Sequence, residues 1–284
     1  MKSAQGQAMP APTIPMGPEA FGPSDHTTVY WLGGAGVFIN SRGTLLMVDP
    51  TISTIPASIL PGGALLSEVN GTECLIPPPI SAAFVPRLDA ILYTHSDDDH
   101  MGMVSAQVLR GLNCPYHATG ETAAKLETLG VPKRQIVVHG RNERYTIGHV
   151  TVQMTPATHP WQQSVPEAFH GWRYADEDCT GLKFITPDGV IWLPGDTLPL
   201  PEHRENTDVN LMFVDFSDDP FHYGGQNTLD LANHLSGAQL IAYHWGTLNM
   251  PDFLPQNTDP YAWRQKVLPP ERLHILAAGE PYRL

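Results

Sequence analysis

The feature that most constrains this fold is an acidic, histidine-containing segment that follows a short apolar run. Residues 88–92 are typical of a buried strand, and residues 103–110 are typical of a helix. Between them, His95-Ser96-Asp97-Asp98-Asp99-His100 places two imidazoles and three carboxylates within six residues. A loop at the carboxyl end of a strand is where open α/β sheets usually carry their chemistry. Buried carboxylates need compensating charge, so the segment predicts bound cations.

The spacing of this segment predicts two neighbouring cation sites. In an extended loop, His95, Asp97 and Asp99 project to one side and His100 projects to the other. His95 and Asp97 could then bind one metal ion, while Asp99 and His100 bind a second one nearby. The alternative is a solvated acidic loop without a metal.

Three further candidate ligands follow apolar strands later in the chain. Residues 150–154 lead to His159, residues 189–193 lead to Asp196, and residues 239–243 lead to His244. A single histidine after a strand is more often an ordinary polar residue than a ligand. Three strand-end candidates in this order, behind the His95–His100 loop, favour a dinuclear metal centre over the solvated loop.

These motifs together make the chain similar to the metallo-β-lactamase-fold hydrolases. The resemblance runs from about Thr27 to Glu280 and includes the glycine-containing segment 31–39, the Val48-Asp49-Pro50 turn and Gly195-Asp196-Thr197. The single-domain length and the His244-Trp245-Gly246-Thr247 ending are most similar to the branch that contains L-ascorbate-6-phosphate lactonase. The family motif is usually HxHxDH, and Asp97 stands where the second histidine is expected.

The resemblance implies a fold, a ligand set and a catalytic residue. The implied fold is α/β (α+β), an αββα sandwich of two mixed β-sheets with outer helices. One metal would be bound by His95, Asp97 and His159, and the other by Asp99, His100 and His244, with Asp196 bridging them. By the same analogy Asp99 would be the catalytic residue that orients the nucleophile and returns a proton to the leaving group.

The ligand set predicts the mechanism and a preference for the metal. A hydroxide that bridges two metal ions could cleave a small ester, lactone or amide without a covalent nucleophile, and the chain has no GxSxG motif. The carboxylates of Asp97, Asp99 and Asp196 against two divalent ions leave a charge of +1, which the hydroxide brings to zero. The oxygen of Asp97 shifts the expected preference from zinc toward manganese, with iron as a third option. The alternatives are a phosphodiesterase of the same fold, a mononuclear-iron oxygenase on this scaffold and a non-catalytic binding module.

Composition limits the partners. The net charge of −13 comes from 16 basic and 29 acidic residues without a Lys/Arg cluster, which argues against nucleic acid and anionic membranes as partners. No apolar run approaches the roughly 20 residues of a membrane span. Three widely separated cysteines indicate no disulfide framework and fit the cytoplasm. We expect a small-molecule substrate, and the sequence leaves homo-oligomerisation open.

The chain divides into an arm and one domain. Residues 1–26 are rich in Pro and Gly and predict an N-terminal arm or disordered extension, and residues 27–284 predict a single hydrolase domain. The irregular segments 51–87 and 160–178 are expected to border the site and control access, or to be passive surface. His222 and Tyr223 are candidate proton donors, although a structural loop is the favoured interpretation there.

Overall fold

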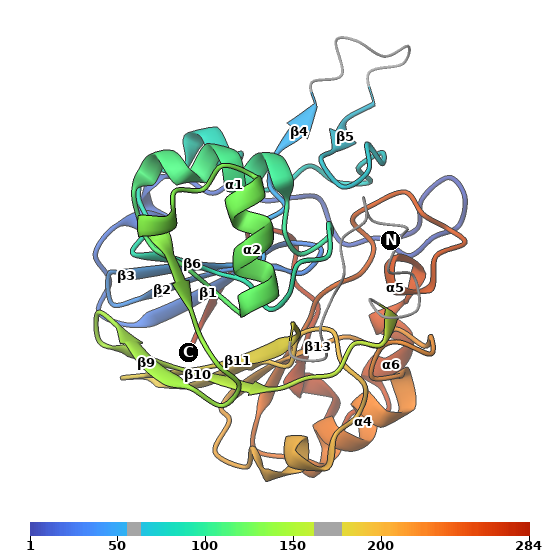
Figure 1. The fold of residues 1–284 in the computed structure, drawn as a ribbon. Coiled ribbons are helices and arrows are strands. Elements are labelled where there is room, and N and C mark those ends of the chain that lie inside the picture. The colour runs from blue at the N-terminus through green and yellow to red at the C-terminus, as the bar shows by residue number, and fades with distance from the viewer. Residues whose placement is uncertain (56–63, 162–177) are drawn as a thin grey trace.

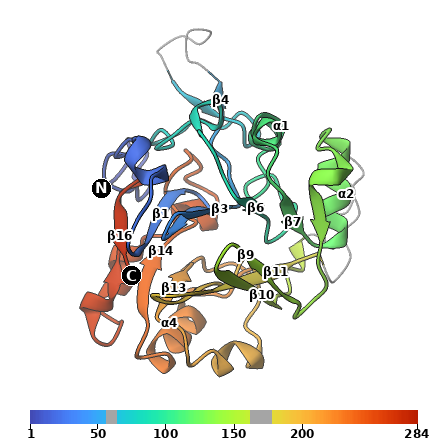
Figure 2. The same ribbon diagram turned by 90° about the vertical axis from the view of Figure 1, so that its left-hand side faces the viewer.

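The computed structural model describes residues 1–55, 64–161 and 178–284, and its centre is a pair of facing β-sheets (Figure 1). Helices cover the outer side of each sheet, as the second view also shows (Figure 2). The predicted αββα sandwich of two mixed sheets is therefore confirmed. Within the described ranges, no helix combines the length and the apolar character that a membrane crossing requires.

The first sheet carries the His95–His100 loop. Its strands are, in spatial order, β16 (Pro281–Arg283), β1 (Thr27–Gly33), β2 (Gly36–Ser41), β3 (Thr44–Val48), β6 (Ala90–Leu92), β7 (Tyr116–Ala118) and β8 (Ile136–Val138). The strands from β16 to β3 pair antiparallel, and those from β3 to β8 pair parallel.

The second sheet has the same sequence of pairings. Its strands are, in spatial order, β15 (Leu273–His274), β14 (Gln239–Ala242), β13 (Leu211–Val214), β12 (Gly189–Leu193), β11 (Thr180–Thr186), β10 (Val150–Pro156) and β9 (Arg144–Ile147). The strands from β9 to β12 pair antiparallel, including the hairpin of β11 and β12, and those from β12 to β15 pair parallel. Strands of both sheets, β6 in the first and β10, β12 and β14 in the second, are followed by the residues that were predicted as metal ligands.

Strand residues alternate between two apolar cores. On β2, Val37 and Ile39 pack into the core that contains residues of both sheets, whereas Phe38 packs into the core under the helices of the first sheet. Because both faces are covered, β2 and β3 are buried at every position, which explains their continuous apolar sequence. Trp31 and Trp192 are fully buried in the first of these cores.

Five α-helices are described. Residues of α1 (Met103–Leu109) and α2 (Gly120–Thr128) pack on the first sheet, and residues of α4 (Gly225–His234) pack into the core that includes the second sheet. The short helices α5 (Leu254–Asn257) and α6 (Pro260–Arg264) follow β14.

The N-terminal arm packs against the domain in this structure. Ala20 and Phe21, in the 3-10 helix Pro18–Phe21, are buried in the core under the first sheet. Further upstream, Gln7 is 1% exposed and its side-chain amide donates to the carbonyl oxygens of Leu248 and Gln256, each at 2.8 Å. The backbone N–H of Met250 donates to Gln7 Oε1 at 2.9 Å. The arm is thus fastened to the segment that follows His244.

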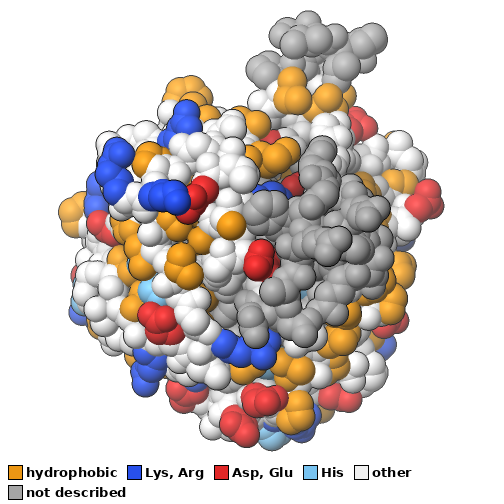
Figure 3. All heavy atoms as spheres, viewed as in Figure 1, with side chains coloured by type: hydrophobic (Ala, Val, Ile, Leu, Met, Phe, Trp, Pro, Cys, Tyr) orange, Lys and Arg blue, Asp and Glu red, His pale blue; other side chains and the backbone are white. Residues whose placement is uncertain are grey.

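A two-stranded hairpin of β4 (Thr54–Ile55) and β5 (Leu66–Ser67) projects from the body beside α1 (Figures 1 and 2), with apolar side chains at its base (Figure 3). Its anchor is Glu68, which accepts hydrogen bonds from the backbone N–H groups of Ser53 at 2.9 Å and Ser105 at 2.8 Å. Burial raises the pKa of Glu68, although these hydrogen bonds oppose that shift. The anchor joins the hairpin to the first turn of α1.

Candidate metal centre

The structure brings together all seven residues that the sequence predicts as metal ligands. They lie at four strand ends: the loop after β6, the residues after β10, the residues after β12 and the residue two positions after β14. Two groups have ligand atoms within 4.8 Å of one another, namely His95 with His159 and Asp196, and Asp99 with His100 and His244. We call these groups the first and the second triad. The second triad is the ligand set that the family resemblance implies for one metal, whereas the first triad contains two of the other implied ligands together with Asp196, the implied bridging residue.

Asp97 lies between two histidines of the first triad. Its Oδ2 is 3.4 Å from His95 Nε2 and 3.3 Å from His159 Nε2. The backbone carbonyl of Phe221 lies 3.0 Å from His159 Nδ1 and so fixes the orientation of that ring. Asp97 therefore points toward the same space as His95 and His159, which is the direction that a ligand at this position requires.

Asp49 supports the loop from behind, as an acceptor outside the ligand set. It follows β3 in the left-handed conformation, with φ of 46°, and its Oδ2 lies 2.9 Å from His100 Nδ1. Its carboxylate also accepts hydrogen bonds from the backbone N–H of Thr94 at 2.8 Å and from the Thr94 hydroxyl at 2.6 Å. Fixing Nδ1 of His100 directs Nε2 of that ring into the site.

His244 is fixed by the glycine-containing turn after β1. Its backbone has φ of 60°, an unusual conformation for a residue with a β-carbon, and its N–H donates to the Gly34 carbonyl at 2.8 Å. The indole N–H of Trp31 donates to the same carbonyl at 2.8 Å. Nε2 of His244 lies 3.2 Å from Asp99 Oδ2. The Trp31–Ile39 motif therefore positions a residue that is more than 200 positions away in the chain.

Two residues of the centre were not predicted as ligands. His222 Nε2 lies 2.8 Å from Asp196 Oδ2, and its Nδ1 lies 2.6 Å from Asp219 Oδ2. Asp215 Oδ2 lies 3.4 Å from His244 Nδ1. With Asp196 and His244 these residues form a third group that could bind an ion. The favoured interpretation of 215–225 as a structural loop was incomplete; the signal for a site was the position of these polar residues directly after buried β13.

The local charges favour a cation at this position. Burial disfavours the protonated form of His100, but the carboxylates of Asp196 and Asp49 outweigh burial and raise its pKa well above the usual value. Burial also disfavours protonation of His222, yet its carboxylate neighbours, Asp196 foremost, raise its pKa to about 10. Burial raises the pKa of Asp97, but His95 and His159 reverse the effect and hold it well below the usual value.

The donor set also fits a metal by its hydrogen bonding. Among the described residues, His95 Nε2, His100 Nε2 and Asp196 Oδ1 are buried side-chain atoms without a well-oriented hydrogen bond. Each faces another group of the centre, since His95 Nε2 lies 3.4 Å from Asp97 Oδ2 and His100 Nε2 lies 3.2 Å from Asp196 Oδ1. Buried polar groups in native structures are nearly always satisfied, and an exception calls for an explanation such as a bound ion, a water molecule or a catalytic role. Imidazole nitrogen and carboxylate oxygen are ligands that zinc, manganese and iron accept.

A second layer of buried polar contacts supports the metal loop from helix α2. Lys125 Nζ lies 2.9 Å from Asp98 Oδ1 and also contacts the Ser96 carbonyl. The Ser96 hydroxyl donates to Asp178 Oδ2 at 3.0 Å, and Thr122 donates to Asp178 Oδ1 at 2.8 Å. The third carboxylate of the loop, Asp98, is therefore neutralised by a lysine.

A cavity of about 430 Å³ opens over the centre. Its floor includes Asp97, Asp99, His159 and Asp196. Val69 and Asn70, from the predicted 51–87 segment, and Trp161, from the 160–178 segment, line it. The placement of these residues agrees with the predicted border of the site. Residues 56–63 and 162–177 lie outside the described ranges.

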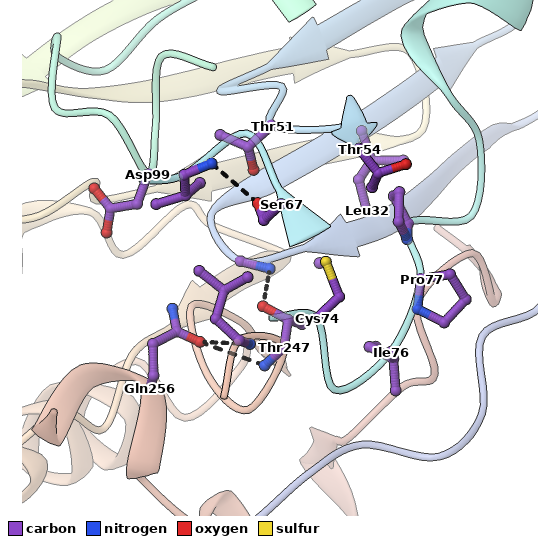
Figure 4. Close-up of a pocket in the computed structure, with 15 residues that line it drawn as sticks. Leu32, Thr51, Thr54, Ser67, Cys74, Ile76, Pro77, Asp99, Thr247 and Gln256 are labelled. Carbon is purple, nitrogen blue, oxygen red and sulfur yellow. Dashed lines mark hydrogen bonds between the residues drawn. The ribbon is translucent and has the colours of Figure 1, made fainter. Parts of the chain in front are cut away.

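Residues of the segment 248–256, which Gln7 of the N-terminal arm contacts, line another part of this cavity. Gln256 is 1% exposed, and its side-chain oxygen accepts from the backbone N–H groups of Thr247 and Leu248, each at 3.3 Å. Figure 4 shows these contacts in an adjoining cavity of about 30 Å³, which Asp99 also lines. The residues between Leu248 and Gln256 thus form a tethered wall.

Known proteins share the sequence pattern of this chain. Residues 46–245 match the model of the beta-lactamase superfamily domain. An uncharacterised protein of Mycobacterium tuberculosis is 26% identical over 294 aligned positions, which cover 96% of this chain and 70% of that protein. A UPF0173 metal-dependent hydrolase of Pyrobaculum neutrophilum is 23% identical, covering 78% of this chain and 96% of the relative.

A solved structure has the same fold. The isothiocyanate hydrolase from Delia radicum gut bacteria superimposes with a TM-score of 0.68 at 16% identity, covering 90% of this chain and 98% of that one. At this identity the likeness shows the fold alone.

Proposed function

Because this chain belongs to the beta-lactamase superfamily, we propose that it is a metal-dependent hydrolase that cleaves a small ester, lactone or amide. The observation that carries the proposal is the convergence of the buried atoms His95 Nε2, His100 Nε2 and Asp196 Oδ1, which form no well-oriented hydrogen bond within the described chain and lie beside other candidate ligands. The similarity to a relative named as a metal-dependent hydrolase supports it.

The proposed ligands are those of the sequence prediction. His95, Asp97 and His159 would hold one divalent ion, and Asp99, His100 and His244 would hold the other, with Asp196 between them. Two such ions would polarise the substrate carbonyl and lower the pKa of a water molecule between them. Manganese or zinc would fit the mixed oxygen and nitrogen set, and iron is the third option.

Asp99 is the proposed catalytic residue. Its side chain is 29% exposed and lines the cavity, while Oδ2 faces His244 Nε2 at 3.2 Å. Burial raises the pKa of Asp99, but His244 and His100 lower it below the usual value, so the group is an anion at neutral pH. An anionic oxygen at the cavity floor can orient the attacking water and carry its proton to the leaving alkoxide or amine.

His222 is a positioning residue in this proposal. It joins Asp219 to Asp196 and thereby fixes the carboxylate between the two proposed metal positions. Asp215 faces His244 Nδ1 in a comparable way. Carboxylate partners of ligating histidines orient the ring and raise its basicity.

We also propose a cytoplasmic location. Cys74, Cys114 and Cys179 form no disulfide among the described residues, and burial raises the pKa of Cys74 and of Cys114 to about 11. Cysteines outside disulfides, with thiols that are hard to ionise, are typical of a reducing compartment.

The test begins with metal analysis of the purified protein and continues with hydrolysis assays after that metal is restored. We expect about two ions per chain, turnover of simple esters or lactones, and loss of turnover with a chelator. His244→Ala and Asp196→Asn should abolish turnover with the fold intact, while His234→Ala and Asp230→Asn, on the surface of α4, should not. Cleavage of a phosphodiester alone, or oxygen consumption with one iron per chain, would replace the proposal by one of its alternatives.

A further inference from the structure

The wall of the main cavity is apolar on the side away from the proposed ligands. Side chains of Trp161, Phe221, Leu248, Met250, Phe253 and Leu254 line it. Phe253 is 42% exposed and Leu254 is 51% exposed, so large apolar groups beside the cavity remain in contact with water. A ligand that covered them would gain from removing this surface from water.

Apart from the histidines, the charged groups of the same cavity are acidic. Besides the proposed ligands, the lining includes Asp98, Asp219 and Asp252, and among the described lining residues there is no Lys or Arg. Asp98 is paired with Lys125, and Asp219 with His222, which also contacts Asp196. These cations are therefore already engaged, so a negatively charged substituent would meet further carboxylates and no unengaged cation among the described lining residues.

We infer that the acyl group of the substrate, which would lie against this wall, carries an uncharged, apolar substituent such as a short alkyl chain or an aromatic ring. This rests on the proposed function and names its substrate class. A phosphorylated lactone, the substrate type of the branch that the sequence resembles, would present this wall with an anion. The sequence similarity therefore does not extend to the chemistry of the wall.

Three p-nitrophenyl esters test the inference: the acetate, the pentanoate and the hemisuccinate. The last two have acyl groups of similar size that end in a methyl group and in a carboxylate. We expect kcat/KM to rise about threefold to fourfold per methylene from acetate to pentanoate. The hemisuccinate should be at least about tenfold poorer than the pentanoate. A hemisuccinate as good as the pentanoate, or no dependence on chain length, would overturn the inference while leaving ester hydrolysis established.

Variants of the wall separate its contribution from that of the metal centre. Phe253→Ala should lower kcat/KM for the pentanoate and leave the acetate nearly unchanged, with the same metal content. Phe84→Ala is the matched control, because Phe84 is 79% exposed and lines none of the described cavities near the centre. Leu254→Lys should reduce the preference for pentanoate over hemisuccinate. An unchanged preference in Leu254→Lys and Phe253→Ala would remove this wall from substrate recognition. Failure of all three esters, and of simple lactones and amides, with the metal restored would instead overturn the proposed function, and the inference with it.

Discussion

The imidazole of His222 lies 2.8 Å from Asp196, the carboxylate that stands between the two proposed metal positions. The other ring nitrogen faces Asp219, so the ring can turn away from neither partner without losing a buried contact. The contact therefore restricts how Asp196 can rotate.

We expect His222→Ala to weaken metal binding or lower kcat by roughly 10- to 100-fold, as removal of such outer partners commonly does. Metal affinity by competition with a chelator dye, together with kcat, would measure the effect. His222→Gln should recover part of the loss, because its amide can still donate to Asp196. His234→Ala is the control, since His234 lies on the exposed side of α4. Wild-type affinity and turnover in His222→Ala would show that Asp196 does not depend on this contact.

Asp97→His should change the metal preference. The substitution removes one negative charge and replaces an oxygen ligand by imidazole nitrogen between His95 and His159. Zinc affinity relative to manganese should rise. Asp97→Ala should lose the metal of the first triad and retain the one near Asp99 and His100. Equilibrium metal content, measured with both ions present, checks both variants. A stoichiometry near one per chain that is the same in wild type and both variants would exclude Asp97 as a ligand.

Lys125→Met should destabilise the protein by about 3–5 kcal/mol, because it leaves the Asp98 carboxylate buried without its partner. The comparison is Lys133→Met, which breaks an ion pair with Glu127 in which the lysine side chain is 82% exposed. That change should cost about 1 kcal/mol or less. Urea unfolding gives both values, and equal losses would mean that the Lys125–Asp98 pair does not stabilise the metal loop.

Gln7→Ala should raise KM more than it lowers kcat. The variant removes three hydrogen bonds to the segment between Leu248 and Gln256, which forms the apolar wall, and it touches no proposed ligand. Metal content should stay at the wild-type level. Gln5→Ala is a matched control, because Gln5 is exposed. Identical kinetics in the two variants would show that the arm has no influence on the wall.

Acid should destabilise the protein through His117. Burial, with the charge of His139, lowers the pKa of His117 to about 4. An unfolded chain protonates the same residue near pH 6.5, so between these values the unfolded state binds more protons than the folded state. The free energy of unfolding should therefore fall as the pH drops from about 6.5 to about 4, by about 3 kcal/mol from this group. His117→Phe preserves an aromatic ring beside Tyr145 and should flatten that part of the curve. A curve as steep as that of the wild type would assign the acid sensitivity to other groups.

The strands that carry the candidate ligands followed from local patterns in the sequence, whereas the two complete ligand sets rested on the family resemblance. Apolar runs that end in His, Asp or Gly are short-range signals, and the strands carrying His95, His159, Asp196 and His244 were predicted close to their actual positions. From the sequence, His222 was only a candidate proton donor in a loop interpreted as structural, and Asp215 was not singled out, because an acidic loop with Pro and Gly has the same composition as a surface turn. Their role depends on which strand end they meet in space.

The arm was harder still to predict. Residues 1–26 show no hydrophobic periodicity. Gln7 nevertheless donates hydrogen bonds to Leu248 and Gln256, which are separated from it by 241 and 249 positions in the sequence. Single side-chain contacts over such distances leave no local pattern in one sequence. The strand β16, three residues long, was missed for a similar reason, since its pairing with β1 closes the sheet from the other end of the chain.

The tethered wall has a consequence for how such proteins diversify. Gln7 and the residues from Leu248 to Gln256 lie outside the segment 46–245 that matches the superfamily model, whereas all seven proposed ligands lie inside it. Mutations could therefore change the apolar wall while the proposed metal ligands stay the same. Two related proteins could then share every proposed ligand and still act on different substrates. An activity assigned from the shared segment alone would give the type of reaction but not the substrate.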